Sequence, residues 1–119
     1  MPDTQLSIRL DLTSGDRIGP GKIALLEAIQ ATGSISAAAR RLGMSYRRAW
    51  LLVEDINRSL MKPAVISEVG GSRGGGAAVT ETGAVVIRLY RAIEQLSRDA
   101  ASEEFQSLGR LVRRGKRRV

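Results

Sequence analysis

Two arginines and two aromatic residues stand close together near the middle of this 119-residue chain, at Tyr46, Arg47, Arg48 and Trp50. At 100° per residue, Arg47 points directly away from the apolar side of its helix, with Tyr46 and Trp50 on one flank and Arg48 on the other. A guanidinium can donate two hydrogen bonds to guanine, and aromatic edges contact thymine methyls or sugars. This pattern indicates a helix that reads base edges in the major groove of DNA.

Two helices joined by a short turn must hold this surface. In the first, apolar residues recur at i, i+3, i+4 and i+7, which are Ile35, Ala38, Ala39 and Leu42. Ser34 is suited to cap that helix and Gly43 to end it. Ser45 then caps a second helix, expected over residues 45–60, whose inward positions are Ala49, Leu52, Val53, Ile56 and Leu60. Little bulk at the crossing favours a helix-turn-helix, and a helical hairpin of some other domain is the alternative.

The composition excludes several function classes. The chain has no histidine and no cysteine, so catalytic triads, thiol nucleophiles and imidazole-bound zinc are ruled out. We therefore expect neither an enzyme nor a metal or cofactor site. No apolar run approaches the roughly 18 residues of a membrane helix, and the N-terminus does not resemble a secretory signal. These features favour a cytoplasmic protein that does not contact membranes.

The formal net charge of +7 is mostly an effect of the C-terminus. Residues 110–119 hold six of the 19 basic groups and none of the 12 acidic groups. They also lack apolar periodicity, so we expect a disordered basic tail after a single domain over residues 1–109. Within that domain, positive charge gathers on the predicted helix-turn-helix.

A β-hairpin is expected directly after the second helix. Pro63 blocks that helix, and strands are predicted over residues 65–69 and 77–79. The glycine-rich tip, residues 70–76, carries Arg73 at its centre, which favours a contact with phosphates or the minor groove, although a merely flexible turn would have the same composition. No Lys-Ser or Lys-Thr follows, so a nucleotide-binding loop is excluded. A hairpin in this place is the wing of a winged helix.

Apolar residues at both ends of the domain complete the predicted fold. Strict alternation from Leu6 to Leu12 predicts a half-buried strand, with a brief return pairing at 17–18, and Pro20 opens a helix that ends at Gly33. Thr80 caps a last long helix with an a/d-type seam, for which we expect a role in dimerisation: Val86, Leu89, Ile93 and Leu96. Packing of this seam on the domain's own core is the alternative. The predicted class is mainly α with a small β component, a winged helix-turn-helix.

Several ordered motifs resemble the N-terminal DNA-binding domain of the ModE family of molybdate-responsive bacterial regulators, and more distantly LysR-type regulators. They are Gly33-Ser34-Ile35-Ser36, Ser45-Tyr46-Arg47-Arg48-Ala49-Trp50, Gly70-Gly71, Gly74-Gly75-Gly76-Ala77, Thr80 and Gly83. The resemblance implies a homodimer, joined through the N-terminal strand and the last helix, that binds double-stranded DNA. The residues expected at the DNA are Ser34, Ser36, Ser45, Tyr46, Arg47, Arg48, Trp50 and Arg73.

Two departures from the family pattern affect what the resemblance implies. Positions 47 and 48 are both arginine, where the family has a lysine and then a small residue, so the preferred operator is expected to differ. ModE proteins carry molybdate-binding domains after the last helix, whereas a short basic tail follows here. We therefore expect DNA binding that does not respond to molybdate. A module that partners a separate sensor protein is the alternative function.

Overall fold

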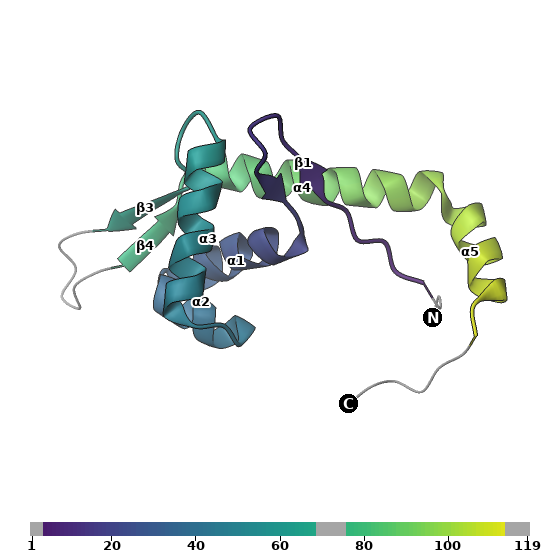
Figure 1. Ribbon diagram of the computed structural model, residues 1–119, viewed down its shortest axis with the longest axis horizontal. Helices are drawn as coiled ribbons and strands as arrows, with labels where there is room; N and C mark the ends of the chain where they lie inside the picture. Colours follow the sequence, from purple (N-terminus) through teal and green to yellow (C-terminus); the bar gives the residue numbers. More distant parts are fainter. Residues whose placement is uncertain (1–3, 69–75, 114–119) are drawn as a thin grey trace.

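A computed structural model describes residues 4–68 and 76–113 of the chain. There the chain forms five helices and two small antiparallel sheets, arranged as in Figure 1. In order, the elements are β1 (Leu10–Asp11), β2 (Arg17–Ile18), α1 (Pro20–Thr32), α2 (Ile35–Leu42), α3 (Tyr46–Ser59), β3 (Val65–Glu68), β4 (Gly76–Val79), α4 (Glu81–Ala100) and α5 (Ser102–Leu111). This is the predicted α+β winged helix.

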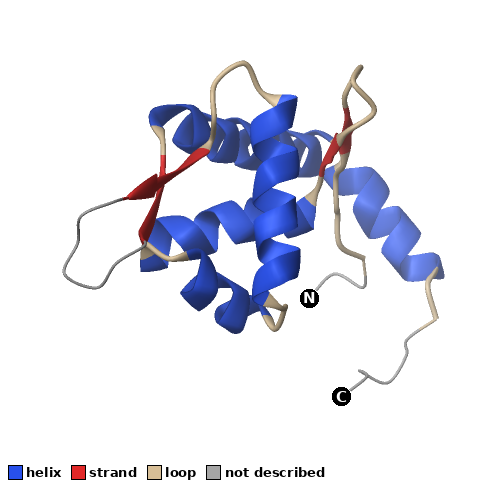
Figure 2. Ribbon diagram, turned by 60° about the vertical axis from the view of Figure 1, so that its left-hand side comes forward, coloured by secondary structure: helices blue, strands red, loops and turns tan. Residues whose placement is uncertain are grey.

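Helix α1 forms the centre of the core, with α2, α3 and α4 packed around it (Figure 2). Its side chains are buried on several sides, which explains why the sequence shows no clear polar face here; the buried set is Ile23, Leu25, Leu26, Ala28 and Ile29. The helix ends at Gly33, whose φ of 70° is left-handed and suits glycine. The turn at Gly33 then directs the chain into α2.

The wing strands β3 and β4 pair in an antiparallel register that runs from Val65–Val79 to Glu68–Gly76. The backbone N–H of Ala77 also donates to the carbonyl of Gly33, at 3.0 Å, so the wing is joined to the turn between α1 and α2. The predicted tip ends one residue too late, because Gly76 already belongs to β4. The remainder of the tip, including Arg73, lies outside the described residues.

The N-terminal strand is shorter than the alternation predicts. Pairing covers only Leu10–Asp11, opposite Arg17–Ile18, because the return segment reaches Pro20 at the start of α1 after two residues. The alternation itself is confirmed, since the side chains from Leu6 to Leu12 are alternately half-buried and exposed. The Tyr90 hydroxyl donates to the carbonyl of Ile8 at 2.7 Å, which fixes this segment on α4.

Helix α4 is fixed to the domain at its first three turns. Thr80 caps it by accepting from the N–H of Gly83, as predicted. A Cβ on Gly83 would lie 2.4 Å from the carbonyl oxygen of Ala64, so only glycine allows this close approach. Further along, Arg91 donates to both carboxylate oxygens of Glu27 on α1, at 2.7 and 3.0 Å. These hydrogen bonds raise the pKa of Arg91 and hold α4 against α1.

The last helix is not continuous, which corrects the single long helix predicted from the sequence. The chain turns at Ala101 and continues as α5. This turn brings Phe105 to a cavity of about 550 Å³ that it shares with Leu6 of the N-terminal segment. Helix α5 also extends to Leu111, so the first residues of the predicted tail are helical, and residues 114–119 lie outside the described part. None of the described helices combines the length and apolarity needed to cross a bilayer.

Candidate nucleic-acid interface

The predicted helix-turn-helix is present, and local sequence signals shape it. The Ser34 and Ser45 hydroxyl oxygens accept from the backbone N–H of Ala37 and Arg48, each at 3.1 Å, so both predicted caps are confirmed. Gly43 ends α2 at a φ of 68°, a left-handed conformation that lets the chain reverse within three residues. Buried Ala39 and Ala49 allow α2 and α3 to approach closely. The first turn of α3 is thereby held at the surface.

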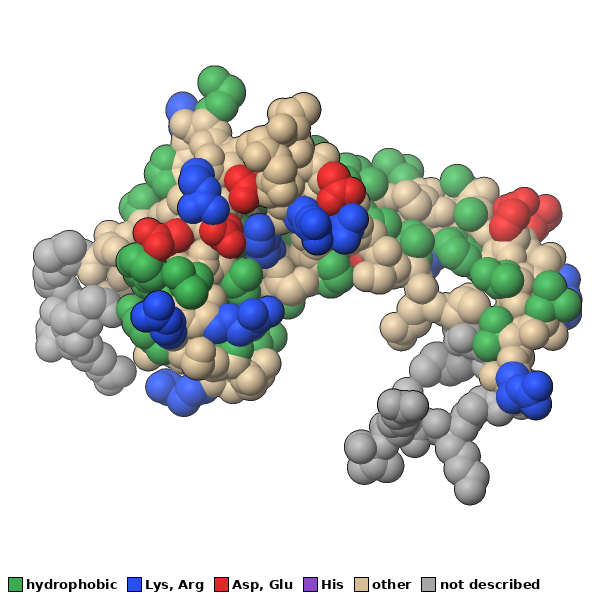
Figure 3. Space-filling model, viewed as in Figure 1, with side chains coloured by type: hydrophobic (Ala, Val, Ile, Leu, Met, Phe, Trp, Pro, Cys, Tyr) green, Lys and Arg blue, Asp and Glu red, His purple; other side chains and the backbone are tan. Residues whose placement is uncertain are grey.

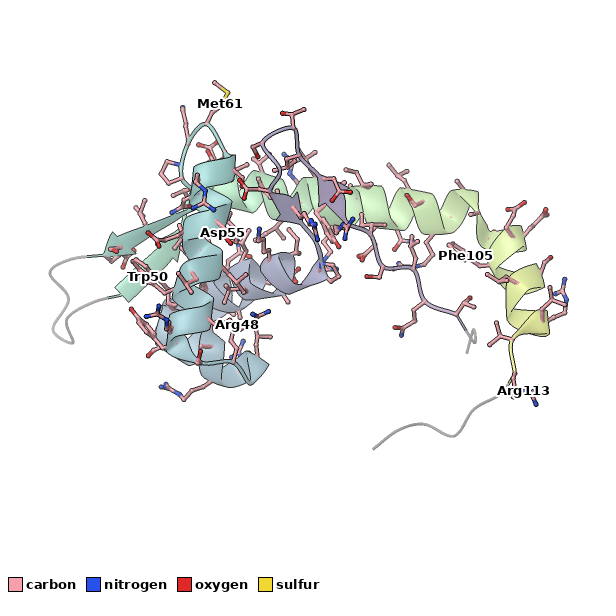
Figure 4. All side chains as sticks on the ribbon, viewed as in Figure 1. Arg48, Trp50, Asp55, Met61, Phe105 and Arg113 are labelled. Carbon is pink, nitrogen blue, oxygen red and sulfur yellow. The ribbon has the colours of Figure 1, made fainter. Side chains whose placement is uncertain are left out.

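The outward surface of α3 carries the predicted residues. Tyr46, Arg47, Arg48 and Trp50 are all exposed, while Ala49 is buried beneath them. Figure 4 shows Trp50 on the side of α3 that faces the wing and Arg48 on the other side. Helical geometry places Arg47 between these flanks, about 60° from Trp50 and about 100° from Arg48. The arrangement therefore presents one cation flanked by an aromatic ring and a second cation.

Ser34 and Ser36, the other two predicted DNA-binding positions, lie at the start of α2. Both are half-buried, and the Ser34 oxygen serves as the helix cap. They lie beside the first backbone N–H groups of α2, and free N–H groups at a helix N-terminus can bind a phosphate. The structure brings these two residues and the α3 set onto the helix-turn-helix.

Arginines without an acidic partner and arginines in ion pairs lie at different ends of α3. Among residues 4–68 and 76–113, none of the arginines in ion pairs lies on α2 or in the first turns of α3; they are Arg9, Arg17, Arg58, Arg91 and Arg98. Arg47 and Arg48 have no such partner there. In Figure 3, Lys and Arg side chains at the lower end of α2 and α3 stand without acidic neighbours, whereas charges of both signs mix higher up. Unneutralised positive charge thus gathers at the start of α3.

The far end of α3 is neutralised. Arg58 contacts Asp55, and it also lies 3.6 Å from Asp16 in the turn after β1. The hydrogen bond and charge of Asp55 raise the pKa of Arg58. An anion therefore meets uncompensated cations at the start of α3 and paired charges at its end.

Sequence reasoning missed Asn57, which joins α3 to the wing. Its amide nitrogen donates to the Val65 carbonyl at 3.0 Å, and its amide oxygen accepts from the N–H groups of Ala64 and Val65 at 2.8 and 3.1 Å. Thr80, which follows β4, also binds the segment before β3: its hydroxyl donates to the Pro63 carbonyl at 2.7 Å. The only sequence signal for this link is a polar residue close to the inward side of α3.

Three further exposed side chains near the turn were also missed. Arg40 and Arg41 stand in the last turn of α2, and Leu51 follows Arg47 by one turn on α3. The sequence signal for Leu51 is the helix period, which places it only 40° from Arg47 in projection.

The predicted dimerisation seam is divided between two environments. Leu89, Ile93 and Leu96 are exposed on the part of α4 that extends away from the helix-turn-helix, while Val86 packs against the domain's own core. Ile87 and Tyr90, on another side of α4, are buried. We call Leu89, Ile93 and Leu96 the α4 stripe.

Known proteins similar to this chain include molybdenum-pterin-binding proteins and ModE transcriptional regulators. The chain is 49% identical over 81 residues to the molybdenum-pterin-binding protein MopB of Rhodobacter capsulatus, covering 68% of this chain and 30% of MopB. It is 35% identical over 102 residues to the molybdenum transport protein ModE of Azotobacter vinelandii, covering 83% and 38%. The DNA-binding transcriptional dual regulator ModE of Escherichia coli K12 is 37% identical over 81 residues, covering 68% and 31%.

These relatives support the ModE family. The chain spans about a third of the length of the ModE and Mop proteins that it matches. No family model matches the chain. Among solved structures, the MarR family transcription regulator SP03579 aligns with a TM-score of 0.58 at 20% identity, over 76% of this chain and 61% of that protein, which supports the winged-helix fold.

Proposed function

We propose that the protein is a sequence-specific transcriptional regulator that binds operator DNA as a homodimer. Helix α3 lies in the major groove, and the glycine-rich tip of the wing, residues 70–76, contacts the backbone or minor groove. The supporting observation is the outward surface of the first turns of α3, where Arg47 and Arg48 have no acidic partner in the described chain. The ModE relatives, one of them named a DNA-binding regulator, support the same function.

The homodimer is proposed from the α4 stripe. Its three side chains form a continuous apolar line on one side of α4, and in the described structure they remain 42–67% exposed. Helical geometry directs this line more than 100° away from the side that buries Ile87 and Tyr90. Burying the stripe against a second copy removes apolar surface from water and brings two copies of α3 into one assembly.

The same stripe supports a second candidate function, pairing with a different regulator that carries a sensor. Such a module would use an apolar contact and would have no need of unpaired arginines on α3. Salt separates the two functions, because each phosphate contact contributes a slope of about −0.9 in log affinity against log salt, whereas an apolar contact changes little.

The test begins with selection of bound fragments from random DNA by the purified chain. Titrations of the selected DNA from low to high salt follow, with Arg47→Ala and Arg110→Ala as a matched pair. Arg110 is also exposed but lies on α5, at the opposite end of the long axis (Figure 1). We expect a selected motif, steep salt dependence and weaker binding only for Arg47→Ala. An absence of sequence preference would contradict the proposal. Repeating the titrations with molybdate or with sulfate tests whether an oxyanion changes the affinity for DNA.

A further inference from the structure

Leu51 is a large apolar side chain on the surface of α3, with 44% of its area exposed. It does not belong to the hydrophobic core or to the side chains packed against it. Single exposed leucines are ordinary on protein surfaces, so exposure by itself carries no function. The position of Leu51 on α3 is what distinguishes it.

Helical geometry places Leu51 on the outward side of α3, one turn beyond Arg47. Four residues advance the helix by 400°, so the two side chains lie about 40° apart in projection. The buried side of the helix, marked by Ala49, Val53 and Ile56, faces nearly the opposite way. Leu51 therefore shares the surface that the proposed function presents to DNA.

The charges along α3 show where this surface ends. Arg47 and Arg48 precede Leu51, whereas Glu54 and Asp55 follow it. Glu54 is exposed, and a carboxylate is repelled by phosphates, so close contact with DNA is favoured only up to Leu51. Leu51 is the last outward side chain before the acidic part of α3, and it is apolar.

We propose that Leu51 contacts the C5 methyl group of a thymine in the major groove, beside the guanine that Arg47 binds. The thymine methyl is the apolar group among base edges in that groove, and an apolar side chain is its natural partner. This inference rests on the proposed function and adds to it the identity of a second base pair.

The helix rise gives the expected spacing of the two bases. Four residues correspond to about 6 Å along α3, and base pairs are stacked about 3.4 Å apart. The thymine therefore lies one or two base pairs from the guanine, on either strand. Selected operators should contain this guanine–thymine combination once in each half-site.

The test replaces thymines of the selected operator one at a time with deoxyuridine, which lacks only the methyl group. For the wild-type protein, one replacement in each half-site should weaken binding about fourfold, the value for one buried methyl group. Leu51→Ala should bind the thymine and deoxyuridine operators equally, within about twofold. Leu51→Met should retain the preference, because methionine remains long and apolar.

Leu111→Ala is the control variant. Leu111 is an exposed leucine at the end of α5 and should behave as wild type. Equal wild-type affinity for every deoxyuridine operator would overturn the inference while leaving the proposed function intact. An unchanged methyl preference in Leu51→Ala would overturn it too. Failure to select any operator would instead contradict the proposed function itself.

Discussion

Asn57 near the end of α3 is bonded in both directions to the backbone of Val65, the first residue of the wing. The side chain donates to the Val65 carbonyl and accepts from the Val65 N–H, at 3.0 and 3.1 Å. A single side chain thus replaces the backbone pairing that Val65 would find in a wider sheet. The wing is thereby held at a fixed position relative to the proposed recognition helix.

Replacing Asn57 with alanine should destabilise the domain by about 1–3 kcal/mol, because partly buried backbone groups lose their partners. Asn57→Asp keeps the two acceptor contacts but sets a carboxylate oxygen against the Val65 carbonyl, so it should also be less stable than wild type. Urea denaturation followed by circular dichroism measures all three proteins. Wild-type unfolding midpoints for both variants would show that the link does not contribute to stability.

Arg47→Ala should lower operator affinity by about 1–3 kcal/mol and relax the preference at one base pair, since a bidentate contact to a base is lost. The measurement is fluorescence anisotropy with the selected operator and its single-base variants. An equal loss of affinity for every variant would instead identify Arg47 as a phosphate contact.

Leu89→Glu or Ile93→Glu should convert a dimer into monomers, because each places a charge within the α4 stripe. Sedimentation at micromolar concentration measures the change, and operator affinity should fall with it. Met61→Glu is the control, since Met61 is fully exposed in the segment between α3 and β3. A wild-type protein that sediments as a monomer would refute the homodimer.

Gly83→Ala should destabilise the protein by about 1–3 kcal/mol. Its new Cβ would meet the Ala64 carbonyl oxygen at 2.4 Å and a Val79 methyl at 2.7 Å, so the backbone has to move. Gly21→Ala, in the first turn of α1, meets no atom within 4 Å and should raise stability by up to about 1 kcal/mol. Thermal unfolding distinguishes these opposite changes; equal midpoints for the two variants would contradict the close approach at Gly83.

Tyr90→Phe should weaken the hold on the N-terminal segment by about 1 kcal/mol, through loss of the hydrogen bond to Ile8. Burial raises the pKa of the Tyr90 hydroxyl, and the charge of Glu94 adds to this effect. The unfolded chain therefore loses this proton first, and stability falls as the pH rises above about 10.

Urea titrations at pH 8 and at about pH 10.5 test this pH dependence. Wild type should lose more stability than Tyr90→Phe between the two values. Equal losses for wild type and Tyr90→Phe would show that Tyr90 does not titrate differently in the folded state.

The features predictable from the sequence were those that local chemistry decides. Ser34, Ser45 and Thr80 cap their helices because a hydroxyl reaches an N–H three residues ahead, and Gly43 ends α2 because few other residues adopt its φ. The exposed set around Arg47 follows equally from the helix period. Such signals need no knowledge of the tertiary structure.

The features that could not be predicted from the sequence depend on tertiary packing. The turn at Ala101 has neither proline nor glycine to mark it. It places Phe105 at the same cavity as Leu6, about 100 residues away in sequence. The N-terminal strand is short because its partner segment is short. The role of Asn57 depends on Val65, which the tertiary structure places beside it.

Glu27 and Arg91 join α1 to α4 by two hydrogen bonds, and α3 also packs against α1, so α1 connects the α4 stripe to the outward surface of α3. In a dimer built on that stripe, the protein therefore sets the separation of its two recognition helices. DNA whose half-sites are spaced or phased differently must bend or twist to fit, at a cost that depends on the base pairs in between. In such a dimer, the deformability of a spacer that no side chain touches would become part of what the protein recognises.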